Sequence, residues 1–149
     1  MANDISFPTI KIPSFDELLN IIAEGFISLG LEPYRIIVGV PPTMGTDLIN
    51  STAYVQQQGL KEYFCWIKFY KFELDLREEN EKDLQFMMAT QTRGEENHYF
   101  ATIITYILAK KLGRVIYDDA HLVQKKDIYS VDELLPFVEA AKEKIYPKI

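Results

Sequence analysis

The stretch YFCWIKFYKFELDL, residues 63–76, decides the expected fold because its side chains alternate strictly along the chain. A period of two predicts a β-strand. One face of this strand would carry Phe64, Trp66, Tyr70, Phe72, Leu74 and Leu76. The other face begins apolar, with Tyr63, Cys65, Ile67 and Phe69, and ends polar, with Lys71, Glu73 and Asp75. We therefore expect burial on both faces in the first half and one wet face in the second.

A strand of this length would be unusually long, so we also expect a bend or bulge within it. Residues 77–83 are predicted to form a turn, and residues 84–91 to pair back as a hairpin. Residues 34–40 predict another strand. Residues 114–117 and 121–124 predict a second hairpin, across a turn at Asp118 and Asp119.

Three helix starts carry the same capping-box signature, a Ser or Thr followed three residues later by Glu. These starts are Ser14, Thr92 and Ser130. Residues 46–58 predict a weaker fourth helix. Pro136 falls inside the last helical stretch, which predicts a separate first turn or a kinked helix.

The fold class predicted is α+β, with an antiparallel or mixed sheet of about five strands and about four helices. The chain has no repeat and no Pro/Gly-rich linker, so residues 1–149 are interpreted as a single domain. Residues 1–10 are expected to be the loosest segment, although residues 9–12 offer a short edge strand.

Charge and composition limit the possible functions. Lys and Arg number 16 against 22 Asp and Glu, which gives a net charge of −6 and argues against nucleic-acid binding. The single cysteine, Cys65, excludes an internal disulfide framework. We find no apolar run of the roughly 18 residues that cross a bilayer, and no signal peptide at the N-terminus. We therefore expect a cytoplasmic protein with no membrane partner and no cofactor.

The motifs of common enzymes are missing from the sequence. It contains no G-x-S-x-G, no H-E-x-x-H and no G-x-G-x-x-G. Cys65 lies between Phe64 and Trp66, so we interpret it as an inert core thiol rather than a nucleophile. These features favour a non-enzymatic interaction domain.

An alternative function is a small metal-dependent enzyme. Glu95 and His98 share a helix face at i, i+3, and Asp118 and His121 form a second acid–histidine group. The structural interpretation is that Glu95 completes a capping box and that Asp118 belongs to a tight turn. A self-associating structural protein is a further alternative, and the oligomeric state does not follow from the sequence.

The most unusual segment is residues 73–83. It is predicted to bind a basic partner, because concentrated charge accelerates association. Tyr70 and Phe72 are candidate anchors behind it. The alternative interpretation is a solvated loop. The candidate partner-binding residues are Glu73, Asp75, Glu78, Glu79, Glu81 and Asp83, opposed only by Arg77 and Lys82.

One further segment runs from an amphipathic helix (residues 99–113, ending at Gly113) into a short apolar strand, Val115-Ile116-Tyr117, and the acidic pair Asp118-Asp119. It is similar to a segment found in small bacterial proteins of unassigned function and in immunity proteins of polymorphic toxin systems. That resemblance implies a non-enzymatic binder that neutralises a toxin. The acidic charge of this chain fits a basic toxin.

Overall fold

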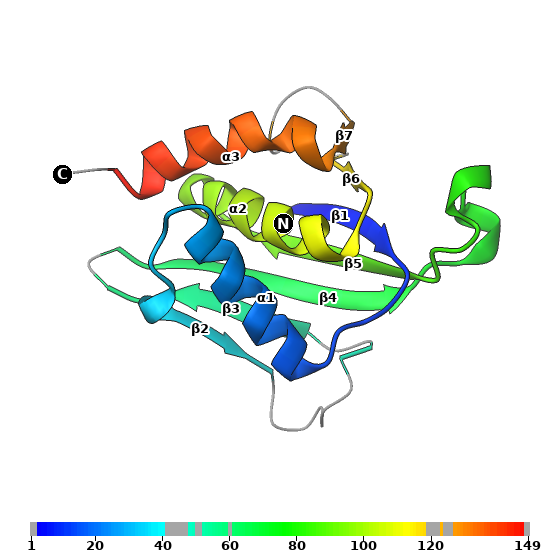
Figure 1. The fold of residues 1–149 in the computed structure, drawn as a ribbon, viewed down its shortest axis with the longest axis horizontal. Coiled ribbons are helices and arrows are strands. Elements are labelled where there is room, and N and C mark those ends of the chain that lie inside the picture. The colour runs from blue at the N-terminus through cyan, green and yellow to red at the C-terminus, as the bar shows by residue number, and fades with distance from the viewer. Residues whose placement is uncertain are drawn as a thin grey trace.

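Seven strands form one antiparallel sheet in the order β2-β3-β4-β5-β1-β6-β7, and three α-helices lie across one of its faces (Figure 1). The computed structural model describes residues 3–40, 48–49, 52–59, 61–118, 123 and 127–147, and these counts refer to those residues. The strands are β1 Asn3–Thr9, β2 Ile36–Gly39, β3 Thr52–Gln57, β4 Tyr63–Lys71, β5 Phe86–Thr92, β6 Val115–Tyr117 and β7 Ile128–Ser130. The helices are α1 Phe15–Ser28, α2 Glu95–Leu112 and α3 Val131–Ile145, with short 3₁₀ turns at Pro33–Arg35, Leu74–Leu76 and Glu79–Glu81.

The predicted α+β class with an antiparallel sheet is confirmed, but the predicted numbers of strands and helices are wrong. Part of the segment expected to form a fourth helix, residues 46–58, is strand β3. Ala53 and Val55 are buried beneath the helices, while Tyr54 on the opposite face is half-buried. This period-two burial between β2 and β4 outweighs the weak helical pattern of the segment.

The N-terminal segment also differs from expectation. Asn3–Thr9 is strand β1, which lies between β5 and β6, whereas the edge strand expected over residues 9–12 does not extend past Thr9. Its alternate residues Ile5 and Phe7 are fully buried under the helices. This alternation directs one face of the strand toward the helices.

Strand β4 ends at Lys71 and the chain turns into 3₁₀ structure at Leu74–Leu76, so the expected strand over residues 63–76, with a bend or bulge within it, was wrong in its last part. Tyr63, Cys65, Ile67 and Phe69 are buried against the helices. Burial on both faces was predicted wrongly, since no helix in the described structure covers the face that carries Phe64 and Trp66.

The two serine caps are confirmed. Ser14 Oγ accepts a hydrogen bond from the Glu17 N–H at 3.2 Å, and Ser130 Oγ accepts one from the Glu133 N–H at 3.1 Å. Thr92 was predicted wrongly as the third cap, because it is the last residue of β5 and pairs with Asn3 of β1.

Helix α2 instead begins after Gly94, whose φ of 85° suits a glycine. From Phe100 to Ala109 every residue of α2 is buried, between the sheet on one side and α1 and α3 on the others.

Helix α3 passes through Pro136 without ending, so the predicted separate first turn is wrong. The loss of one hydrogen bond there is offset by the packing of Leu134 and Val138 in the core.

The second hairpin pairs β6 with β7, Ile128–Ser130, rather than with residues 121–124. Of those predicted partners, residues 121, 122 and 124 lie outside the described part of the chain.

Between β4 and β5, residues 72–85 extend past the end of the sheet, at the right of Figure 1. We call residues 72–85 the acidic arm.

Candidate functional site

The face of the sheet opposite the helices, which we call the open face, carries half-buried and exposed side chains from five neighbouring strands. The register places Tyr54, Trp66, Gln91 and Asp4 in one row across β3, β4, β5 and β1. The next row contains Thr52, Lys68, Ala89, Ser6 and, on β6, Tyr117. A ligand could therefore approach this face without displacing any helix.

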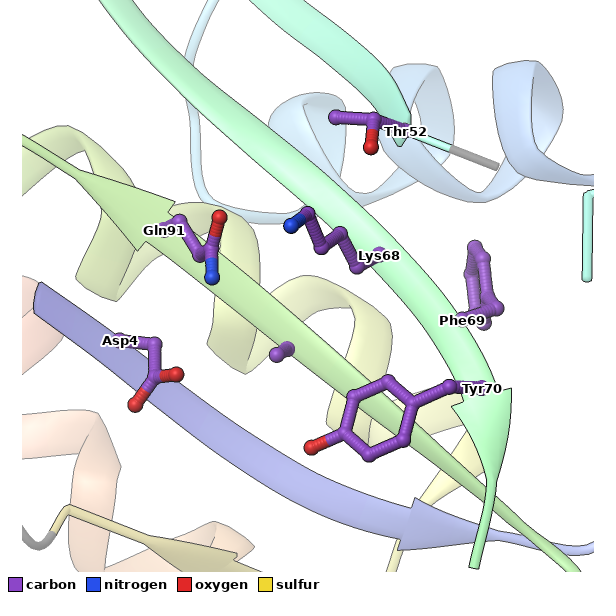
Figure 2. A pocket seen from close by; sticks show the side chains of 7 residues that line it. Asp4, Thr52, Lys68, Phe69, Tyr70 and Gln91 are labelled. Carbon is purple, nitrogen blue, oxygen red and sulfur yellow. The ribbon is translucent and has the colours of Figure 1, made fainter. Parts of the chain in front are cut away.

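A pocket of about 410 Å³ lies at the centre of the open face (Figure 2). Ala89 leaves space between the longer side chains around it. Lys68, Gln91 and Asp4 project from three adjacent strands, and the ring of Tyr70 reaches across β5 toward β1. Burial raises the pKa of Tyr70, and the charge of Asp4 raises it further. The pocket thus offers an amine, a carboxylate, an amide and a phenol for hydrogen bonding.

Aromatic residues gather toward the opposite end of the open face from the acidic arm. Tyr54 and Phe64 stack with ring centroids 6.0 Å apart, and Phe64 meets Trp66 edge to face at 4.7 Å. The Arg93 guanidinium lies 5.8 Å from the Trp66 ring centroid. Because these groups cover one another, we assign them to the stability of the sheet face.

The acidic arm is held in shape by its own two cations. Arg77 donates to the carbonyl oxygen of Phe72 through Nε and Nη2, at 3.0 and 2.6 Å, and to that of Lys82 through Nη1 at 2.9 Å. Lys82 Nζ donates back to the Arg77 carbonyl at 3.3 Å. Both positive charges are thus directed at backbone carbonyls rather than at the carboxylates of the arm.

The six predicted partner-binding acids fall into two groups. Glu81 is 4% exposed and accepts hydrogen bonds from the Tyr117 hydroxyl and the Glu78 N–H. Asp83 pairs with Arg114 at 2.6 Å, and this hydrogen bond lowers the pKa of Asp83. These two acids fix the arm to itself and to the end of the α2–β6 connection.

The other four acids are free to meet a partner. Glu73, Asp75, Glu78 and Glu79 are exposed, and none forms an ion pair with a described residue. Leu74 and Leu76 lie among them with 59% and 70% of their surface exposed. The arm therefore combines negative charge with apolar side chains.

The predicted anchors behind the acids differ from each other. Tyr70 is exposed on the open face, whereas Phe72 is buried in a small cluster with Leu84 and Met87. Neither the exposure of the two leucines nor the contact from Tyr117 to Glu81 was predicted from the sequence. Leu74 and Leu76 were assigned to a strand face, and nothing in the sequence links Tyr117 to a residue 36 positions away.

Of the four residues of the alternative metal site, the structure describes Glu95, His98 and Asp118, and these three do not form a group that could hold a metal ion. Glu95 is exposed in the first turn of α2 and His98 follows one turn later. Asp118 directly follows β6 and is fully buried, and its Oδ2 accepts a hydrogen bond from the Val123 N–H at 2.9 Å. His121 lies outside the described residues, and no group of three metal-ligating side chains occurs within them.

Comparison with known proteins gives no relative. No family model, curated protein or solved structure matches this chain. The resemblance of residues 99–119 to immunity proteins therefore stays a prediction. Within the described residues, none of the helices has the length and apolar character needed to cross a membrane.

Proposed function

We propose that this protein is a non-enzymatic interaction domain that binds a basic partner protein through its acidic arm. The observation that carries the proposal is the set of four exposed carboxylates, Glu73, Asp75, Glu78 and Glu79, none in an ion pair with a described residue. Charges concentrated at one projecting end of a protein raise the rate of encounter with a partner of opposite sign.

The exposed leucines favour an interface over a merely solvated loop. Leu74 and Leu76 are presented to solvent side by side with the acids, in a short segment whose backbone is held by Arg77. A few residues carry most of the binding energy of an interface, while surrounding charges set orientation and rate. The resemblance to immunity proteins makes a basic bacterial toxin the class of partner we propose.

The proposal is tested by affinity capture from a lysate of the source cells with three baits. The first is the wild-type protein, and the second is the arm variant Glu73→Lys/Glu78→Lys/Glu79→Lys. The third is the control variant Glu32→Lys/Glu62→Lys/Glu143→Lys, which reverses three exposed acids that also lack ion pairs. Since three reversals add six charges, both variants have a net charge near zero, starting from −6.

We expect one basic protein to be retained in stoichiometric amounts by the wild-type and control baits and lost from the arm variant. A partner that all three baits retain equally would contradict a role for the arm. Glu81 is left unchanged because it is buried, and its reversal would disturb the fold rather than test charge.

A further inference from the structure

A hollow of about 560 Å³ lies between the acidic arm and the open face, and we call it the arm hollow. Its size falls within the roughly 300–1,000 Å³ of typical ligand pockets. Its base is apolar and aromatic, formed by Tyr70, Phe72, Met87 and Tyr117. Phe72 and Met87 are each 8% exposed and belong to a small core cluster of their own, so the base is a packed surface.

The sides of the arm hollow carry carboxylates. Glu73, Glu78 and Glu81 line it against a single cation, Lys71. Glu81 is fixed by its bonds to Tyr117 and to the backbone of Glu78, while Glu73 and Glu78 are exposed at the rim. Arg77 of the arm donates to the carbonyl of Phe72 and forms no ion pair with these carboxylates.

An apolar base beneath acidic sides suits one type of side chain. Arginine and lysine bury an aliphatic stem along apolar surface and keep a charged head near carboxylates. Aromatic rings below such a head add cation–π attraction, in which arginine takes part more often than lysine. Leu76 lines the same hollow and offers contact to an apolar neighbour of that cation.

We propose that the arm hollow receives a short segment of the partner in which an arginine stands next to apolar residues. This inference rests on the proposed function, because it names the chemistry by which the basic partner is held once the arm has attracted it. It assigns the affinity to the hollow and the rate of encounter to the exposed acids, and Glu73 and Glu78 contribute to both.

The test is a nuclear magnetic resonance titration of the isotope-labelled full chain with two peptides. The probe is acetyl-Leu-Arg-Leu-amide, and the matched control replaces arginine with citrulline, which has the same shape and no charge. We expect the arginine peptide to shift the resonances of Phe72, Met87 and Tyr117, and the citrulline peptide to bind about threefold or more weakly. Shifts confined to the exposed arm, or equal binding of both peptides, would overturn the proposal.

Two variants make the titration specific. Ser6→Phe places a ring into the hollow from β1 without changing any charge, and we expect it to abolish the shifts. Gln91→Phe, on the same face but outside the hollow, is its control and should bind like wild type. If Ser6→Phe does not fold, the surface variant Glu73→Gln/Glu78→Gln replaces it, and should weaken only the arginine peptide.

Failure of the hollow and failure of the proposed function give different results. If arm reversal releases the captured partner but Ser6→Phe binds the peptide like wild type, the arm still binds a basic protein and the hollow has no role. If arm reversal has no effect on capture while the peptide titrates into the hollow, the hollow is a separate cation site and the proposed function is wrong.

Discussion

Glu81 is the residue on which the shape of the acidic arm depends. It is 4% exposed, and its carboxylate accepts from the Tyr117 hydroxyl and the Glu78 N–H. Glu81→Ala removes a buried carboxylate together with the two part-buried hydrogen bonds that it accepts, so we expect a loss of about 1–3 kcal/mol in the free energy of unfolding. Urea denaturation measures this loss. The exposed neighbour variant Glu79→Ala should stay within about 0.5 kcal/mol of wild type, and equal losses for the two variants would contradict this role.

Asp83 gives a pH-dependent test of the same region. The Arg114 hydrogen bond lowers the pKa of Asp83 in the folded protein below its ordinary value of 3.8. A carboxyl whose folded pKa is lowered stabilises the fold above its unfolded pKa, and this stabilisation is lost as the pH falls through the folded pKa. We therefore expect Arg114→Gln to return the pKa of Asp83 toward 3.8 in a nuclear magnetic resonance titration. An unchanged pKa would show that the ion pair is not formed in solution.

Cys65 tests the packing between β4 and the helices. It is fully buried, and this burial raises the pKa of its thiol. We expect the thiol of the folded protein to react with a thiol reagent at pH 8 no faster than the structure around Cys65 opens. The thiol of the unfolded protein should react at once. Rapid reaction without denaturant would contradict the buried position.

At the scale of elements, the α1–α2 crossing depends on Gly25. A Cβ added there would lie 2.2 Å from Cγ2 of Ile107, which is itself 3% exposed. Alanine gains about 1 kcal/mol in helix propensity over glycine, but overpacking costs about 1–3 kcal/mol. Because the clash is close and buried, we expect Gly25→Ala to lower the free energy of unfolding by up to about 2 kcal/mol.

Ile107→Ala provides the partner for a double-mutant cycle with Gly25→Ala. The double variant should lose less stability than the sum of the two single variants, because removal of the Ile107 side chain relieves the clash. Ser28→Ala, exposed on the same helix, serves as the control and should stay within about 0.5 kcal/mol of wild type. Simple additivity would mean that α1 shifts to accommodate the methyl group.

The elements with strong local signals were predictable from the sequence. The boxes at Ser14 and Ser130 define helix starts by their own hydrogen bonds, and the alternation in residues 63–76 defines β4. The box at Thr92 failed because its pairing with Asn3 of β1 overrides a local signal. Strand β3 was missed because its stability comes from β2 and β4 on its two sides, which no local pattern reveals.

At the scale of the whole molecule, the sequence located the acidic segment but not its division into structural and free acids. That division depends on Tyr117, which is part of β6, and on Arg114, which lies between α2 and β6. The fold brings both residues to the arm. The open face was also missed, since the apolar residues Phe64 and Trp66 suggested burial on both sides. Only the placement of all three α-helices on one side of the sheet, within the described chain, leaves that face accessible (Figure 1).

The most direct test of charge-driven partner binding is the association rate of the captured partner with the wild-type, arm-variant and control-variant proteins, measured by stopped flow from low to high salt. We expect Glu73→Lys/Glu78→Lys/Glu79→Lys to slow association at low salt by about tenfold or more, and we expect the difference to shrink as salt screens the arm. The control variant, with the same net charge, should associate nearly as fast as wild type. Equal rates for the arm variant and the wild type at low salt would contradict the account.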